Sequence, residues 1–581
     1  MEASLSALQL AIRGGEVIDG SGGQRVRADV GVRDGRIVAV GDDVGDAEQT
    51  LDATGLVVAP GFIDVHTHYD AQVFWDPMVT PSSEHGVTTV LGGNCGFSIA
   101  PLNGEREDGE YLMRMLSRVE GIPLESLESG VPWNWTSFGS YLSALDGKLA
   151  INAGFLVGHS ALRRHVMGAR ALGEAASADD LHQMGALLRQ SLSEGGLGFS
   201  TTMSRTHNDA EGRPVPSRSA SDDELVSLAR VVGEFEGAWL EMVSDVGTPF
   251  SEANLERMAS MSKAAGRTLN WNVLSPDSRH KDVFESQLAA SDYAARRGAK
   301  VIALAAPQPI KVVLSFAAGM IIDSFAGWEE VMALPLPERK ARLADPDVRR
   351  QLNASMHADA SMRGELGDWS RWTIVETFAA ANKALEGQSI GALASRLGKA
   401  PLDTLLDLVI EEDLRTLVSP PVSGTDNESW RMRGAAWRDP RAIIGASDAG
   451  AHLDMIDTFA FSTQVLSQGV RERNLLGLEE AVHRLTDVPA RAFGLRDRGL
   501  IANGYWADLV VFDPQTVGCG PLYTRRDLPR GAARLYCDAV GIQHVVVNGR
   551  EIIRHGRATG VLAGKVLRSG RDTRTVANAA A

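Results

Sequence analysis

The chain has 581 residues, of which 44% are hydrophobic and 23% are charged, and its 58 Lys and Arg against 74 Asp and Glu give a formal net charge of −16. This composition is typical of a globular protein with a substantial core, and it excludes intrinsic disorder and a collagen-like chain. The acidic balance argues against nucleic acid and anionic membranes as partners.

The cysteine content and the start of the chain predict the compartment. Cys95, Cys519 and Cys537 are too few for a disulfide framework in so long a chain. The N-terminal stretch has no basic flank before its apolar residues, and no run of about 18 apolar residues follows it. We therefore expect a cytoplasmic protein without a membrane span.

Both ends of the chain carry the pattern of antiparallel strands. Apolar and polar side chains alternate within residues 1–60 around Asp34-Gly35, a pair typical of a two-residue hairpin turn. The segment 491–581 repeats the pattern, with Asn548-Gly549 as a second hairpin signal. Two β-rich ends therefore enclose a different middle.

The middle of the chain, residues 61–490, alternates short apolar runs with longer amphipathic stretches, which is the pattern of a parallel sheet wrapped in helices. Eight candidate strands follow one another, at 61–66, 88–93, 151–158, 196–200, 237–243, 268–274, 300–306 and 441–447. Amphipathic stretches lie between them, for example at 179–195, 222–237 and 254–266. Eight such units predict an α/β fold with a closed (β/α)8 TIM-like barrel.

Three segments are too long to be simple crossovers between strands. We expect a mostly helical insertion at about 307–440, with its clearest helix at 401–414. Two further insertions after strands are expected at about 101–150 and 203–221.

The first strand of the middle region ends in His66-Thr67-His68. Side chains two residues apart on a strand point the same way, so both imidazoles project together from the strand end that opens on the active-site face of a barrel. Two convergent imidazoles make half of a metal site. The alternative is that both rings only form hydrogen bonds within a polar loop.

The last strand ends in Ser447-Asp448. An ionised carboxylate at the end of a core strand is costly unless it is paired, hydrogen-bonded or bound to a metal. Asp448 is therefore a candidate metal ligand, or a base for a metal-bound water. The alternative is an N-cap for a following helix, supplied by Ser447 or Asp448.

Together these motifs resemble the amidohydrolase superfamily, and within it the N-acyl-D-amino-acid deacylase (D-aminoacylase) family. The resemblance is carried by His66 and His68 after GFID, Asn94-Cys95-Gly96 after the second strand, the Ser447-Asp448 segment, and ADLVVF at 507–512. It extends over nearly the whole chain in the expected order. It implies a barrel, a small β-sandwich built from both termini, and hydrolysis of an amide by metal-activated water.

The resemblance also implies roles for single residues. His66 and His68 match the metal ligands of the first strand, Cys95 matches the thiolate ligand of the D-aminoacylase family, and Asp448 matches the aspartate that binds the metal and moves the proton. A thiolate ligand favours zinc over magnesium or calcium. Cys95 as a small buried core residue is the alternative.

The sequence departs from the family pattern at two strands. The family has a histidine on the fifth strand and another on the sixth, whereas this chain has Glu241 and Asn272 there. Glu241 is a candidate metal ligand, with an ion pair to an arginine as the alternative. Asn272 is a weak neutral donor that fits a hydrogen bond to substrate better. The number of ions, one or two, stays open.

Weaker candidates lie on other loops. His159 follows the third strand and Arg163 could pair with a substrate carboxylate through its planar fork, although structural roles for both are equally consistent with the sequence. His207 and His357 lie on loops that could line a pocket, and His452 fits a role behind the ligands. Six further histidines we assign to surface or packing roles, namely His85, His182, His280, His483, His544 and His555.

We therefore predict a metal-dependent enzyme, with one or two divalent ions and zinc as the expected metal, that cleaves a linear amide of the N-acyl-D-amino acid type, with Asp448 as base and then acid. Its partner would be a small-molecule amide substrate, and homo-oligomerisation stays open. One alternative is hydrolysis of a cyclic amide, a carbamate, or a bulky natural-product or xenobiotic amide. The other is a non-catalytic binding protein that lost its metal, against which the intact His66, His68 and Asp448 argue.

Overall fold

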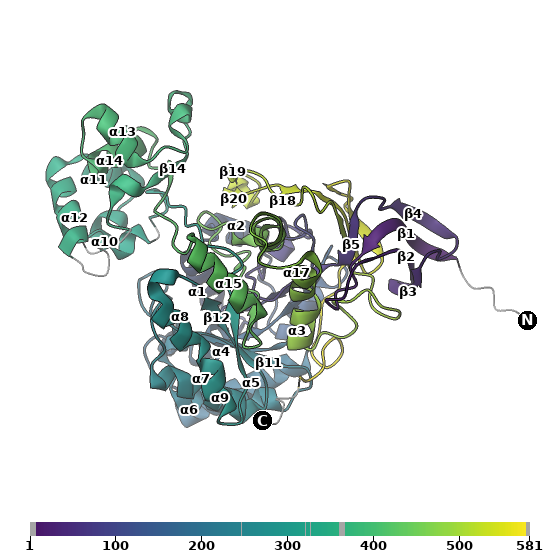
Figure 1. Cartoon of the computed structure of the whole chain (residues 1–581). Helices are drawn as coiled ribbons and strands as arrows, with labels where there is room; N and C mark the ends of the chain where they lie inside the picture. The colour runs from purple at the N-terminus through teal and green to yellow at the C-terminus, as the bar shows by residue number, and fades with distance from the viewer. Residues whose placement is uncertain (1–6, 246, 320, 326, 359–365, 577–581) are drawn as a thin grey trace, which may run out of the picture. The chain divides into compact units, whose positions relative to one another are not determined.

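A computed structural model describes residues 7–576 of the chain, except 246, 320, 326 and 359–365 (Figure 1). The chain divides into two compact units. The first consists of Met1–Gln308, Asp426–Leu453 and Thr458–Ala581. The second consists of Pro309–Thr425 and Asp454–Asp457.

All eight strands predicted for the middle of the chain are present in the first unit, and the prediction of a mixed α/β fold is confirmed. They are β6 (Phe62–Asp64), β7 (Val87–Gly92), β8 (Asn152–Phe155) continued by β9 (Val157–Gly158), β10 (Gly198–Thr202), β11 (Trp239–Val243), β12 (Leu269–Leu274), β13 (Val301–Ala305) and β16 (Ala442–Ile444). Their residues are almost all buried, as expected of parallel strands covered on both faces.

The strands pair in parallel in two sets. One has the order β6-β7-β8 and the other the order β16-β13-β12-β11-β10-β9. Only Leu156 separates β8 from β9, so a single stretch of chain belongs to both sets. An isolated parallel bridge joins Thr67, just after β6, to Ala449, just after β16. The carboxyl ends of these strands therefore lie at one edge.

The crossover helices follow the predicted stretches closely. They include α5 (Ala178–Ser193), α6 (Asp222–Gly233) and α7 (Glu252–Ala265). Each begins after a serine whose hydroxyl accepts a backbone N–H of the first turn, which is a stabilising N-cap. The α7 helix ends at Gly266, which adopts the left-handed conformation that favours glycine.

Strands from both ends of the chain form one nine-stranded sheet (Figure 1). Its members are β1 (Leu8–Val17), β2 (Val26–Arg33), β3 (Arg36–Gly41), β4 (Ala47–Asp52), β5 (Val57–Pro60), β17 (Leu509–Phe512), β22 (Ile542–Val547), β23 (Arg550–Arg554) and β24 (Arg557–Ala558). The purple β5 and the yellow β17 are adjacent antiparallel neighbours, which joins the two ends. Both predicted hairpin turns are confirmed, with positive φ at Asp34-Gly35 and at Asn548-Gly549.

The insertion after β7 is helical. It contains α1 (Arg106–Val119), α2 (Leu124–Gly130) and α3 (Phe138–Leu145). The buried face of α1 carries Leu112, Met115, Leu116 and Val119, spaced three or four residues apart, and these side chains join the main hydrophobic core. Packing of this face fixes the position of the C-terminal end of α1, and Glu120 directly follows that end.

The second unit has its own core and is mostly helical. It contains α10 (Glu329–Met332), α11 (Leu336–Ala344), α12 (Pro346–Ala358), α13 (Ile390–Leu397), α14 (Pro401–Glu411) and the strand pair β14 (Thr373–Glu376) and β15 (Leu417–Ser419). In its hydrophobic core, the Trp369 ring contacts the rings of Trp328 and Trp372. By contrast α15 (Asn427–Arg438), within the predicted insertion, belongs to the first unit because Trp430 and Trp437 pack into that unit's core.

A buried polar network anchors the terminal sheet to β8. Asp508, which directly precedes β17, accepts hydrogen bonds from the Arg498 guanidinium and from the Asn152 side chain, the latter at 3.1 Å. It also accepts the Asn548 backbone N–H at 2.8 Å. Asp508 and Arg498 are both about 95% buried. Within the part of the chain that the structure describes, no helix is both long and apolar enough to cross a membrane.

We expect Asp508→Ala to lower the stability of the protein strongly. Loss of the carboxylate leaves the Arg498 charge buried without its partner, which costs about 3–5 kcal/mol. Calorimetry should show a clear fall in the unfolding temperature, whereas Asp42→Ala, at an exposed position, should leave it within about 1 °C of wild type. Equal unfolding temperatures for the two variants would contradict this role of Asp508.

Candidate metal centre

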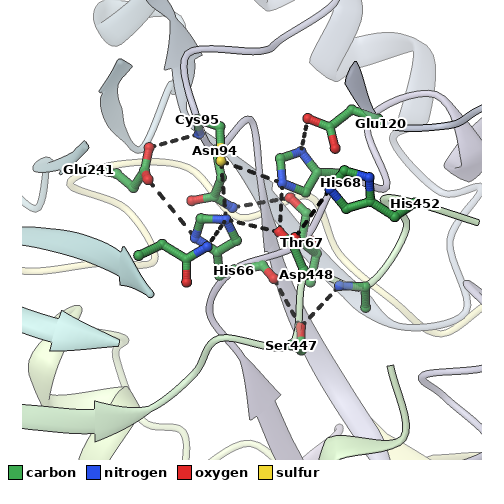
Figure 2. A network of polar contacts seen from close by, with 12 residues as sticks. His66, Thr67, His68, Asn94, Cys95, Glu120, Glu241, Ser447, Asp448 and His452 are labelled. Atoms are coloured by element: carbon green, nitrogen blue, oxygen red, sulfur yellow. Dashed lines mark hydrogen bonds and ion pairs between the residues drawn. The ribbon is translucent and has the colours of Figure 1, made fainter. Parts of the chain in front are cut away.

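His66 and His68 lie directly after β6 and are almost completely buried. Their Nε2 atoms face the Cys95 thiol, at 3.3 Å from Sγ for His66 and 3.7 Å for His68 (Figure 2). One ligand atom from each of the three residues lies within 4.8 Å of the other two. These side chains therefore form a compact group of metal-type ligands.

Cys95 follows β7 in a tight turn. It has φ of 57°, a conformation that is costly for any residue other than glycine and that the surroundings must enforce. Its N–H donates to Glu241 Oε2 at 2.8 Å, and the neighbouring Asn94 side chain donates to the Leu91 carbonyl at 2.8 Å. Both hydrogen bonds hold the turn so that the thiol points at the two imidazoles.

Asp448 follows β16, and its carboxylate lies next to both histidines. Its Oδ1 lies 3.1 Å from His68 Nε2 and 3.4 Å from His66 Nε2. Asp448 also has positive φ, of 54°, and no helix begins after it before Thr458–Ala460 within the described residues. It therefore does not act as the N-cap that the sequence left open. Ser447 donates to the buried carboxylate of Asp64 at 2.7 Å, which orders this strand end.

Glu241 on β11 and Asn272 on β12 both reach His66. The Asn272 Nδ2 atom is 3.4 Å from His66 Nε2. Glu241 Oε1 is 4.0 Å from the other ring nitrogen, Nδ1. The structure thus brings both substituted strand positions to the site, with Glu241 on the side of the imidazole that faces away from the thiol.

A further carboxylate, Glu120, contacts the site from the insertion. It directly follows α1, and its Oε1 lies 3.3 Å from His68 Nδ1 (Figure 2). The sequence analysis did not single it out, because it stands in no motif and only the path of the insertion brings it here. Asp64, also not singled out, is two residues before His66, so strand alternation could have indicated it.

Buried negative charge dominates the electrostatics. Burial first, together with the nearby charge of Asp448, raises the pKa of Glu241 to about 8 and that of Glu120 to about 7. Burial also raises the pKa of the Cys95 thiol well above its usual value. A divalent cation among these groups would stabilise their ionised forms. Burial opposes ionisation of Asp448, yet hydrogen bonds from His66 and His68 keep its pKa well below the usual range.

The donor set fits a divalent metal. Tetrahedral zinc holds imidazole nitrogen at about 2.0 Å and thiolate sulfur at about 2.3 Å, so neighbouring ligand atoms should be about 3.3–3.6 Å apart. The observed separations of His66 and His68 Nε2 from Cys95 Sγ, 3.3 and 3.7 Å, agree with this spacing. Two nitrogens and a sulfur are ligands that zinc accepts readily.

His159 and Arg163 are engaged elsewhere. His159 Nε2 is 2.8 Å from Glu224, and Arg163 contacts both carboxylate oxygens of Glu224 at 2.6 Å. All three side chains are buried. The Arg163 fork that the sequence offered to a substrate carboxylate is therefore already paired within the protein.

Other histidines are placed as follows. His207 is half-buried, and desolvation first, followed by the charge of His452, lowers its pKa to about 3. His452 Nε2 lies 3.8 Å from Asp448 Oδ2. His85 is buried and contacts Thr463 at 2.7 Å, in accord with a packing role. The side chain of His357 is outside the described residues.

Comparison with known proteins identifies the family of the chain. A model of the Amidohydrolase family matches residues 49–553, and the chain belongs to this family. N-acyl-D-glutamate deacylase of Alcaligenes xylosoxydans xylosoxydans is 30% identical over 557 residues, covering 93% of each chain. The protein is a hydrolase of the D-aminoacylase type, as the sequence motifs indicated.

Solved structures give the same result. A crystal structure of D-aminoacylase matches with a TM-score of 0.63 at 27% identity, over 97% of this chain and all of that one. N-acyl-D-glutamate deacylase of Bordetella bronchiseptica, solved with zinc and a phosphonate inhibitor that mimics the tetrahedral intermediate, matches with a TM-score of 0.61 at 27% identity over the same shares.

We expect Arg163→Met to lower stability rather than substrate affinity. The change leaves the Glu224 carboxylate buried without its strongest partner, at a cost of about 3–5 kcal/mol. Urea unfolding should show a lower midpoint, while KM of any refolded, active fraction stays near wild type. Arg106→Met, on an exposed side chain, is the matched control. A raised KM with an unchanged unfolding midpoint would instead indicate that Arg163 binds the substrate.

Proposed function

We propose that this protein is a metal-dependent hydrolase that cleaves a linear amide of the N-acyl-D-amino acid type. The observation that carries the proposal is the convergence of His66, His68 and Cys95 next to Asp448 at the carboxyl ends of parallel strands. Two relatives whose names state deacylase activity on N-acyl-D-amino acids align over nearly the whole chain, which supports the same substrate class.

His66, His68 and Cys95 would hold the metal, with Asp448 beside them and zinc as the expected ion. A bound divalent ion supplies Lewis acidity, which polarises a carbonyl and lowers the pKa of water from 15.7 to about 7. Glu241 and Asn272 stand where the sequence comparison expected two further histidines, so we propose a single tightly held ion. We propose that Glu241 positions His66 and Cys95: one carboxylate oxygen lies at the His66 Nδ1 atom, and the other accepts the Cys95 backbone N–H.

Asp448 would move the proton. Its Oδ1 faces the side where both Nε2 atoms point, and a cation held there would keep the carboxylate ionised at neutral pH. As general base it would take a proton from the attacking water, and as general acid it would return that proton to the leaving amine nitrogen. His207 and His452, both held neutral by burial, would line the space beside it.

A second candidate is hydrolysis of another amide-type bond, such as a cyclic amide, a carbamate or a bulkier amide. Two observations favour this candidate. The Asn272 amide lies 3.4 Å from His66 Nε2, and Arg163 is already paired with Glu224 and so is not free for a substrate carboxylate. Loss of catalysis altogether is disfavoured, because the ligand group and Asp448 are all in place.

We also propose that the eight parallel strands close into a (β/α)8 barrel of residues 61–490, with the second unit as its large insertion. Continuity of β8 with β9 and the bridge between Thr67 and Ala449 support closure at both places where the two strand sets meet. The terminal strands, within 1–60 and 491–581, would form a small sandwich. Its support is the apolar cluster around Ile12, Val30 and Leu509 on one face of the nine-stranded sheet.

We expect Asp448→Asn to lower kcat/KM by at least about 100-fold, because a positioned proton-transfer group contributes roughly 10²–10⁴-fold. The variant should keep its fold, as judged by circular dichroism. Asp42→Asn, the same chemical change at an exposed position, should retain full activity. Turnover of Asp448→Asn within a few-fold of wild type would show that another group moves the proton.

A substrate panel tests the bond and its stereochemistry. The zinc-loaded protein should hydrolyse at least one N-acyl-D-amino acid and prefer it to the L-enantiomer, with amine release as the measurement. Hydrolysis of cyclic amides or carbamates with no turnover of N-acyl amino acids would favour the second candidate. No turnover of any member with a fully loaded metal site would contradict an amide hydrolase.

A further inference from the structure

Glu120 is an unusual residue at its position in the fold. It is the C-cap of α1, and its side chain is only 3% exposed. The C-terminal end of a helix carries partial negative charge, so a carboxylate there is destabilised, and burial adds to the cost. A residue that pays both costs needs a favourable interaction elsewhere.

The interaction is with His68. Glu120 Oε1 lies 3.3 Å from His68 Nδ1, while His68 Nε2 faces Cys95 and Asp448. The two ring nitrogens of His68 therefore face different groups: Nε2 faces Cys95 and Asp448, and Nδ1 faces Glu120 (Figure 2). His68 Nδ1 is buried and makes no hydrogen bond within normal limits among the described residues. The Glu120 carboxylate faces it at ion-pair distance, 3.3 Å from Oε1.

The backbone of Glu120 reaches the same site. Its carbonyl accepts the N–H of His452, in the loop that starts at Asp448. The following Gly121, with φ of 63°, turns the chain away, and Ile122 is buried again. The end of α1 is therefore held by buried residues on both sides of Glu120. Glu120 contacts His68, which follows β6, and His452, which lies in the loop after β16.

We propose that Glu120 is a positioning residue that holds His68 as the Nδ1–H tautomer and so directs its Nε2 to the metal. The inference rests on the proposed metal site. A carboxylate behind a ligand imidazole fixes the ring orientation and increases its basicity, and loss of such a partner typically weakens metal binding 10–100-fold. The helical insertion would thereby take part in metal binding without supplying a ligand.

Glu241 stands in a similar relation to His66, but less directly. Its Oε1 is 4.0 Å from His66 Nδ1, and its other oxygen accepts the Cys95 N–H. Each imidazole of the site therefore has a buried carboxylate on its Nδ1 side. Of the two, only Glu120 comes from outside the barrel-type strands, and it is within 3.5 Å of its imidazole.

The test compares zinc affinity and stability of Glu120→Gln with those of wild type. Competition with a chromophoric chelator should show zinc affinity reduced 10–100-fold, and the visible spectrum of the cobalt-loaded variant should differ from that of wild type. The unfolding temperature of the metal-free variant is measured beside that of metal-free wild type, so that a change in zinc affinity is separated from a change in stability. Asp108→Asn is the matched control, since Asp108 is a buried acid of α1 that pairs with Arg164 instead. It should change stability but not zinc affinity.

The outcomes are distinct. Zinc affinity of Glu120→Gln within two-fold of wild type would overturn the inference and leave the proposed function standing, since wild type still binds zinc. A wild type that binds no zinc would overturn both. If Glu120→Gln does not fold, ¹⁵N-histidine NMR of zinc-loaded wild type decides: a proton on His68 Nδ1 is expected, and a proton on Nε2 contradicts the inference.

Discussion

The structure depends on one constraint: a thiol and several carboxylates are buried next to the imidazoles of His66 and His68. Cys95, Glu241 and Glu120 are all buried at this place, and burial raises the pKa of each. Such a group of acids is stable only if protons or a cation neutralise it. A divalent ion held by His66, His68 and Cys95, as we propose, would satisfy the constraint and leave Asp448 ionised beside it.

The fold meets this constraint by bringing strand ends together. The parallel strands β6, β7, β11, β12 and β16 each contribute side chains at their carboxyl ends, which share one edge. Left-handed backbone at Cys95 and Asp448 turns the side chains inward at a conformational cost. The hydrogen-bonded turns around Asn94 and Ser447 offset that cost. The polar network of Asp508 ties the terminal sheet to the same scaffold.

Much of this arrangement follows from local sequence. The eight strands, their crossover helices and both hairpins could be predicted because apolar periodicity, serine caps and Asn-Gly or Asp-Gly turns are local signals. His66 and His68 could be placed together because two-residue spacing on a strand fixes their common direction. The pairing of Arg163 with Glu224 and the contact of Glu120 with His68 join residues more than fifty positions apart, and no local pattern encodes such contacts.

The insertions show the same limit at larger scale. Residues 309–425 form a unit with its own tryptophan-centred core, whereas α15, in the same predicted insertion, packs into the first unit. Amphipathicity predicts that both are helical, but which core a helix joins depends on the shape of the surfaces available.

The most direct measurement of the central claim is anomalous scattering from crystals of the zinc-loaded protein, recorded on both sides of the zinc absorption edge. We predict a peak at bonding distance from His66 Nε2, His68 Nε2 and Cys95 Sγ. Glu120 should lie at the Nδ1 side of His68 and make no bond to the ion. A loaded crystal with no peak at these three atoms, or with zinc held by Glu120 and Glu241 instead, would contradict it.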